Sequence, residues 1–243
     1  MSQLDLACEA DISTRHVSFL ETGRARPSRE MVLHLAERLD VPLRERNVLL
    51  VSTGFAPVFG ERSLDDPALS AARDAIDLVL AAHEPFPAIA VDRHWTLVAA
   101  NRAAGRVFGG VSSELTKPPA NALRMALHPA GLAPRTANFA EWRGDLLARL
   151  RRQVELTADP ILAALYDELA AYPAPHQTRP PPPPNPTAVA IPFRLVTESG
   201  ILSFLSTITV FGTPVDITLS ELAIETFLPA DGATGEALRR MAQ

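Results

Sequence analysis

Cysteine is almost absent from this chain of 243 residues, and its scarcity excludes several classes of protein. Cys8 is the single cysteine, so an intramolecular disulfide is impossible, and no Cys/His cluster has the spacing of a zinc site. No apolar run approaches the roughly 18 to 20 residues that span a bilayer, and no signal peptide begins the chain. The sequence therefore predicts a cytoplasmic protein without a metal, in which Cys8 serves packing.

An excess of positive charge is also missing, since the formal net charge is −5. This argues against a protein that coats nucleic acid indiscriminately, but it allows a specific DNA reader with locally clustered basic residues. The motifs of common enzymes are absent too: there is no Gly-rich phosphate loop and no nucleophile elbow. Glu221 and Glu225 would share one strand face, but solvated charges at a sheet edge explain this pair as well as catalytic carboxylates would. We expect no enzyme, no catalytic residue and no cofactor.

With 47% apolar and 21% charged residues, the chain can bury the cores of two domains, and its beginning reads as all helical. Ser2, Ser13 and Ser28 stand where helix N-caps are expected. Gly23 and Pro42 mark the breaks between helices. The predicted helices cover 3–10, 14–21, 29–39 and 43–51.

The segment from Ser2 to Gly23 resembles the helix-turn-helix of the XRE family of repressors. In that arrangement Val17 and Leu20 pack against Leu4, Leu6 and Ala7, and the polar side of the second helix enters the major groove. Arg15 can then pair bidentately with guanine, and Phe19 either contacts a thymine methyl or belongs to the core. Backbone phosphates pass near the other basic or polar positions. The expected DNA-binding residues are Gln3, Ser13, Thr14, Arg15, Ser18, Phe19, Arg24 and Arg26.

Two features depart from the XRE pattern. The helix that usually precedes this segment has no counterpart after Met1, so the first helix of the module is apparently missing. Residues 1–58 also hold seven arginines, no lysine and eight acids, a net charge of −1. A ligand sensor or interaction partner that has lost DNA binding is therefore the alternative to a DNA-binding regulator.

Residues 59–243 read as a second, α+β domain. Helices are expected from Asp66-Pro67, from Asn101, from Asn121, over 139–154 and from Asp159-Pro160, with a last one over 235–241. Strands are expected over 88–91, 95–99, 188–196, 201–210 and 221–228, and the prolines of 179–186 predict a polyproline connection. The order predicts a central antiparallel sheet with helices on one side.

Several phrases from about residue 55 to the end of the chain resemble the MmyB-like regulators, whose ligand-binding domain has a PAS-like fold. They are Gly54–Pro57, Trp95–Asn101, Asn121–Arg124 with His128-Pro129, Thr213–Thr218 and Phe227–Asp231. The resemblance implies a small amphiphilic ligand, with a fatty acid as the leading class, and two-fold operators imply a homodimer. A carboxylate head group would need fixed donors at the mouth of an apolar cavity. The expected ligand-binding residues are Trp95, Asn101, Asn121, Arg124, His128 and Arg135.

Structural roles compete for each of these six residues, because Asn and Arg often brace loops and Trp95 suits a core. A haem- or flavin-binding PAS sensor is a further alternative. Haem would need an axial ligand, for which His94 and His128 are the candidates.

Overall fold

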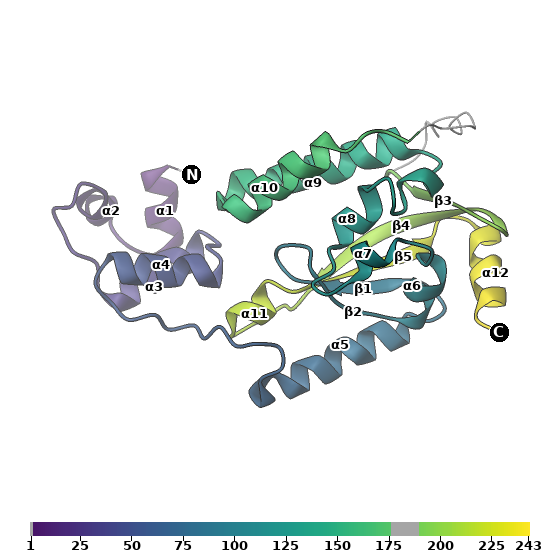
Figure 1. The fold of residues 1–243 in the computed structure, drawn as a ribbon. Helices are drawn as coiled ribbons and strands as arrows, with labels where there is room; N and C mark the ends of the chain where they lie inside the picture. Colours follow the sequence, from purple (N-terminus) through teal and green to yellow (C-terminus); the bar gives the residue numbers. More distant parts are fainter. Residues whose placement is uncertain (1, 176–189) are drawn as a thin grey trace. The chain divides into compact units, whose positions relative to one another are not determined.

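The computed structural model describes residues 2–175 and 190–243, which form two compact units. The first unit contains residues 1–70 and 211–221, and the second contains residues 71–210 and 222–243 (Figure 1). The module predicted over residues 1–58 thus lies in a unit that also includes residues 59–70 and a segment from far along the chain. The predicted polyproline stretch 179–186 lies outside the described residues.

Four helices open the first unit, as the sequence predicted, each within one residue of the expected ends. Ser2, Ser13 and Ser28 accept hydrogen bonds from the backbone N–H three residues ahead, at 3.1 to 3.2 Å, so all three are N-caps. Gly23 has φ +70°, a conformation that glycine adopts without strain, and it follows the end of the second helix. The helices are α1 (Gln3–Glu9), α2 (Thr14–Glu21), α3 (Arg29–Arg38) and α4 (Leu43–Ser52).

The core of the first unit is small. Ala7 and Val17 are buried as expected, but Leu4 is 61% exposed, so its predicted packing against α2 is wrong. Leu4 lies in the first turn of the seven-residue α1, and Ala7 is the residue of this helix that is buried. His34 of α3 makes a 2.8 Å hydrogen bond to the carbonyl of Ala10. Cys8 is exposed, which contradicts the packing role expected for it.

Residues 211–221 complete the first unit through α11 (Ile217–Ser220), a helix that the sequence did not predict. Ile217 is buried, and its N–H donates to the carbonyl of Gly60 at 2.8 Å. Asp216 is only 1% exposed and accepts a 3.0 Å hydrogen bond from Arg62. Polar contacts thus join two chain segments that are more than 140 residues apart.

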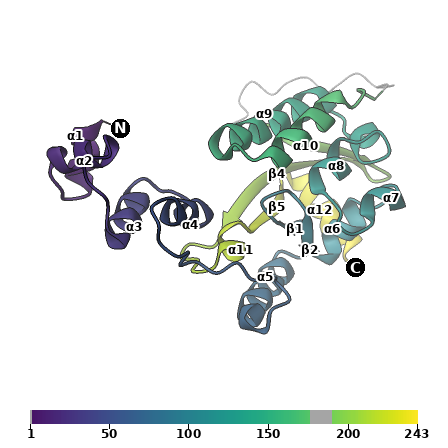
Figure 2. The same ribbon diagram turned by 60° about the vertical axis from the view of Figure 1, so that its left-hand side comes forward.

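The second unit is built on a five-stranded antiparallel sheet with the order β2-β1-β5-β4-β3 (Figure 2). This confirms the predicted α+β class and the antiparallel sheet. The strands are β1 (Ala88–Val91), β2 (Leu97–Ala100), β3 (Phe193–Thr197), β4 (Gly200–Val210) and β5 (Ala223–Pro229).

Helices lie on both sides of this sheet rather than on one side. Helices α8, α9 and α10 lie on one face and α5 on the other (Figure 1). All four residues of β1 are buried, which requires cover on both faces. Ile89 and Val91 belong to the main core, whereas α5 buries its own Ile76 and Leu80.

The helical elements of the second unit follow the predicted caps and apolar spacing. In α9 the inward side chains are Phe139, Trp142, Leu146 and Leu150, and in α10 they are Leu162, Leu165 and Leu169. The elements are η1 (Pro67–Leu69), α5 (Ser70–Ala82), α6 (Arg102–Val107), α7 (Ser113–Thr116), α8 (Ala122–Leu127), η2 (Ala133–Arg135), α9 (Phe139–Thr157), α10 (Pro160–Ala171) and α12 (Gly232–Met241). None of the helices in the described ranges combines the length and apolar character needed to cross a bilayer.

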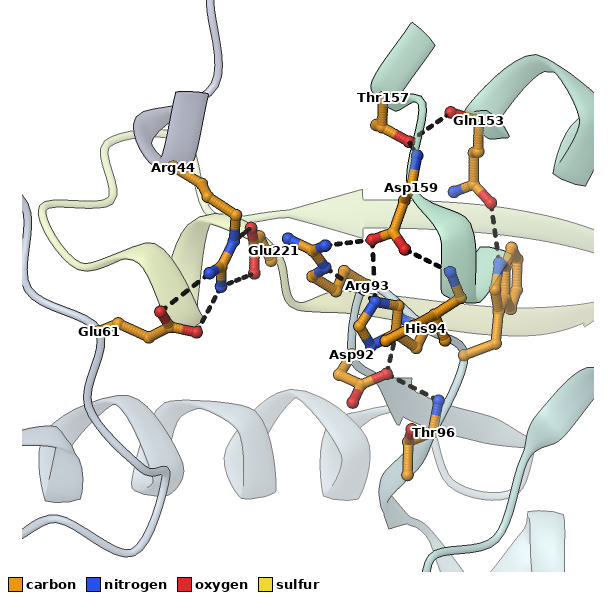
Figure 3. Close-up of polar contacts among 12 residues, drawn as sticks. Arg44, Glu61, Asp92, Arg93, His94, Thr96, Gln153, Thr157, Asp159 and Glu221 are labelled. Carbon is orange, nitrogen blue, oxygen red and sulfur yellow. Dashed lines mark hydrogen bonds and ion pairs between the residues drawn. The ribbon is translucent and has the colours of Figure 1, made fainter. Parts of the chain in front are cut away.

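Three predicted strands begin later than expected. Trp95 does not open β2, because it has φ +64° and belongs to a turn. Asp92 organises this turn, since its Oδ1 accepts hydrogen bonds from the N–H groups of His94 and Thr96 at 2.9 and 2.8 Å (Figure 3). Strand β3 begins at Phe193 within the described residues, and β5 begins at Ala223 because Glu221 caps α11.

Candidate functional site

The N-terminal half of α2 presents a polar surface. Ser13, Thr14 and Arg15 are exposed, whereas Val17 on the opposite side is buried. The Arg15 guanidinium lies 5.1 Å from the centre of the Phe19 ring, a cation–π contact one helical turn along. Phe19 is half-buried, so its ring supports Arg15 from a position between core and surface.

The remaining predicted DNA-binding residues surround this helix. Arg24 and Arg26 are exposed in the loop after α2, and Ser18 is half-buried on α2 itself. Gln3 is exposed on α1, and its side-chain amide donates to the carboxylate of Glu21. The eight predicted residues therefore fall on α1, on α2 and its N-cap, or in the loop after α2, and their contacts with DNA remain a prediction.

Two of the seven arginines in residues 1–58 are engaged inside the unit. Arg44 forms hydrogen bonds with both Glu221 and Glu61, and these two carboxylates raise the pKa of its guanidinium above the ordinary value for arginine (Figure 3). Arg46 donates to the carbonyl of Val41 at 2.7 Å. The other five are exposed and carry the positive charge that faces solvent: Arg15, Arg24, Arg26, Arg29 and Arg38.

The second unit contains an apolar cavity of about 230 Å³ on the main-core face of the sheet. Its lining comes from strands β1, β2, β3 and β5, from helices α6, α7, α8 and α9, and from loop residues that include Phe108 to Val111 and Leu132. Trp95 and Trp142, the two tryptophans of the chain, both line it. A largely apolar pocket of this kind suits a small ligand with an apolar body.

One carboxylate interrupts the apolar lining. Glu225 lies on β5, the central strand of the sheet, and is only 4% exposed. Its Oε1 accepts hydrogen bonds from the Nη2 of Arg149, at 3.3 Å, and from the hydroxyl of Ser206. Glu225 is therefore an interior acid, and the interpretation of it as a solvated edge charge is wrong.

Trp95 is held in place from two sides. Its indole N–H donates to the Oε1 of Gln153 at 2.8 Å, and the Arg149 guanidinium lies 5.7 Å from its ring centre. A left-handed backbone conformation is strained for a bulky residue, and such strain concentrates at functional sites. Among the six predicted ligand residues, Trp95 is the one found in the cavity lining.

Asn101 and Asn121 have structural partners. The Oδ1 of Asn101 accepts from the N–H of Ala104, which caps α6, and its amide donates to the carbonyls of Leu80 and Phe86 at 3.1 and 2.8 Å. Asn121 caps α8 and donates to the carbonyl of His94 at 2.8 Å. Both side chains brace backbone outside the cavity lining.

Arg124 and His128 contact residues of α10 and its C-terminal end instead of the cavity. Arg124 forms a bidentate pair with Glu168 of α10, at 2.8 and 2.7 Å, which raises the pKa of Arg124 and lowers that of Glu168. The His128 ring lies edge-on to Tyr172, with ring centres 4.9 Å apart. Burial and the neighbouring Glu168 raise the pKa of Tyr172 to about 12. The structure thus does not bring these residues to the cavity.

Arg135 lies closer to the cavity. Its Nη1 donates to the carbonyl of Gly109, and its Nη2 donates to that of Val107 at 3.2 Å. Gly109 and Gly110 line the cavity, and Gly110 has φ +79°, so this loop needs glycine. Arg135 therefore holds the loop that forms part of the cavity wall.

His94, a candidate axial ligand for haem, belongs to a polar cluster around Asp159 instead. Burial alone would raise the pKa of Asp159, but His94 at 3.0 Å, the N–H of Ile161 at 2.8 Å and Arg93 together lower it to about 2 (Figure 3). Neither His94 nor His128 lines the cavity.

The sequence did not lead us to expect Glu225 and Trp142 in the cavity lining, or Arg149 as the partner of Glu225. Trp142 lies on the inward side of α9, and its helical spacing carries no sign of a cavity. Glu225 shares one face of β5 with the apolar Ala223 and Phe227, and this spacing was the available signal that its side chain is directed toward the core. Arg149 follows one turn after Asp145, the 3.6 Å partner of its guanidinium.

Comparison with known proteins finds two family models that match this chain. The family model described as "MmyB-like transcription regulator ligand binding domain" matches residues 72–241, and a "Helix-turn-helix" model matches residues 1–46. A search of curated proteins finds no match.

Among solved structures, one match is "Structure of an RNA-binding Light-Oxygen-Voltage Receptor", at 13% identity and a TM-score of 0.27. The alignment covers 99% of this chain and 61% of that one, so this chain spans less than two thirds of the length of that protein.

The larger family match covers more than half of the chain, and its members are regulators rather than enzymes. The chain belongs to the MmyB-like transcription regulators and combines a helix-turn-helix DNA-binding region with a ligand-binding domain.

Proposed function

We propose that this regulator binds a specific operator through α2 and that a small amphiphilic ligand in the cavity of the second unit controls this binding. The observation that carries the proposal is the apolar cavity lined by both tryptophans, inside the segment that matches the ligand-binding family. A fatty acid is the ligand class that the resemblance implies.

The exposed polar start of α2 supports the DNA-binding part of the proposal. Ser13, Thr14 and Arg15 precede or begin the helix, which is where recognition helices contact base edges. Arg15 reads guanine in this scheme, because a guanidinium can donate to O6 and N7 together. Arg24 and Arg26 then contact phosphates and position the helix.

The chain connects the cavity wall to the first unit over a short distance in sequence. Glu225 and Phe227 line the cavity on β5, while Glu221, four residues before Glu225, pairs with Arg44 of α4 in the first unit. A ligand that displaces β5 therefore pulls on a segment that belongs to the DNA-binding unit. In a homodimer such a pull changes the separation of the two recognition helices, and with it the fit to a two-fold operator.

Fluorescence anisotropy with duplexes from the upstream region of the protein's own gene tests the proposal. We expect one duplex to bind more tightly than a scrambled duplex of the same composition at the same salt concentration. Addition of an amphiphile that quenches tryptophan fluorescence should change this affinity. A regulator that shows no preference among duplexes, or whose DNA affinity ignores every quenching amphiphile, contradicts the proposal.

A further inference from the structure

We propose that Glu225 is the polar recognition group of the cavity, and that the ligand carries a hydrogen-bond-donating head group, an alcohol or amine, rather than a carboxylate. This inference rests on the proposed ligand-controlled function, because it names the chemistry of the ligand at the same site. It comes from the single charged side chain that the cavity lining contains.

The carboxylate of Glu225 retains capacity to accept a hydrogen bond. Within the described part of the chain, the hydrogen bonds from Arg149 and Ser206 both go to Oε1, and Oε2 receives none. An ionised carboxylate accepts at about four lone-pair positions, so at least one position remains for a ligand. A donor that approaches through the cavity would meet this acceptor in apolar surroundings, where a hydrogen bond is stronger than in water.

A ligand carboxylate would meet the opposite situation. The cluster next to the cavity contains two acids, Glu225 and Asp145, around one base, Arg149, so its formal charge is −1. The side chain of Arg149 is not part of the lining, which places the acid of the pair at the cavity and the base behind it. Arg124, the cation expected to anchor a carboxylate, pairs with Glu168 instead. A second negative charge beside Glu225 would be repelled in a medium that screens it poorly.

The volume of the cavity limits the apolar part of the ligand. An engineered protein cavity of about 150 Å³ holds benzene. The cavity found here is about 230 Å³, half as large again. By that ratio it has room for roughly nine heavy atoms. A medium-length alkyl chain with a small head group meets this limit, and a long-chain lipid would require the cavity to expand.

A titration with octan-1-ol, octylamine and octanoate tests the head group while the alkyl chain stays constant. Quenching of Trp95 and Trp142 reports binding in the cavity directly, since the chain has no other tryptophan. We expect octanol or octylamine to bind at least about tenfold more tightly than octanoate, the ratio of a typical charge-assisted hydrogen bond. In Glu225→Gln, the preference for octylamine over octanoate should fall by about tenfold or more, because the amide is uncharged and can donate to a carboxylate.

Two further variants provide controls. Glu168→Gln removes another arginine-paired carboxylate of the same unit, outside the cavity lining, and should leave the ranking unchanged. Ala126→Leu adds volume at a lining position and should weaken all three ligands equally. If octanoate binds tightest to the unmodified protein, or if Glu225→Gln keeps the ranking, the head-group inference is overturned while the ligand-controlled function stands. If none of the three compounds quenches tryptophan or changes operator affinity, both are overturned.

Discussion

The ion-pair network around Arg44 ties residues 211–221 to the DNA-binding unit, and replacing Arg44 with alanine tests its contribution. The guanidinium donates to Glu221 from Nε and Nη2, at 2.7 and 3.0 Å, and to Glu61 from Nη1 at 2.9 Å. In Arg44→Ala both carboxylates remain without this cation. We expect the 211–221 segment to open more often from the unit.

The size of the effect follows from how far the pair is shielded from water. The side chains of Arg44 and Glu221 are 28% and 17% exposed, between a surface pair and a buried one. Exposed pairs contribute about 0.5 kcal/mol, whereas removing one member of a buried pair costs about 4 kcal/mol. We therefore expect a loss of about 2 kcal/mol, which corresponds to about a 30-fold rise in the local opening equilibrium.

Hydrogen exchange at the amides of Ile217, Ser220 and Glu221 measures this opening. Arg240→Ala serves as the matched control, because Arg240 forms an exposed pair with Glu236 at 3.9 Å and its loss should change exchange little. If coupling runs through this segment, Arg44→Ala also makes operator affinity less sensitive to ligand while tryptophan quenching stays intact. Unchanged exchange over 217–221 in Arg44→Ala would refute the reasoning.

Three further predictions concern the other sites. Arg15→Ala should abolish operator selectivity, at a cost of about 1–3 kcal/mol in the free energy of operator binding, because it removes base contacts. Salt-dependent binding to any duplex should remain, because the phosphate contacts stay. Competition anisotropy measures both, and preserved selectivity would exclude Arg15 as a base reader. Arg124→Ala should leave tryptophan quenching within twofold of the unmodified protein, since its partner is Glu168 rather than the cavity; a large loss would restore its expected anchoring role. Asp159 has a pKa lowered to about 2, so its contribution of roughly 2 kcal/mol is present above its ordinary pKa near 4 and disappears as pH falls through about 2. Asp159→Asn should remove this part of the acid sensitivity in a denaturation series between about pH 5 and 2, and an identical pH dependence in both proteins would contradict the assignment.

The parts of the fold that were predictable from sequence depend on short-range physics. Ser2, Ser13, Ser28 and Asp159 were all predicted as N-caps, and each accepts a backbone N–H two or three residues ahead. Helix faces were predictable for the same reason, since side chains at helical spacing share one side whatever they pack against. These interactions lie within a few residues, and the sequence displays them directly.

The residues that line the cavity of the second unit were harder to predict from the sequence. Arg124 and His128 were predicted to bind the ligand, but Arg124 pairs with Glu168 and His128 contacts Tyr172, and neither lines the cavity. Periodicity reveals that residues share a face, and it does not reveal the neighbour of that face. Glu225 was misinterpreted for a related reason: its strand lies in the centre of the sheet, and its partner Arg149 is 76 residues away.

The place of residues 211–221 in the first unit was also hidden from sequence reasoning, because it depends on long-range contacts. Asp216 is almost fully buried, yet its charge partner Arg62 and its backbone neighbour Gly60 lie more than 150 residues earlier. No local pattern around Thr213–Ser220 signals this, because the segment is simply the connection between β4 and β5 until its distant partners are known. Hydrogen bonds with Arg44, Arg62 and Gly60 hold this connection in the DNA-binding unit, whereas its two ends continue into strands of the ligand-binding sheet. The same covalent segment must therefore satisfy the geometry of both units, and the proposed ligand control uses it as the route from β5 to the DNA-binding unit.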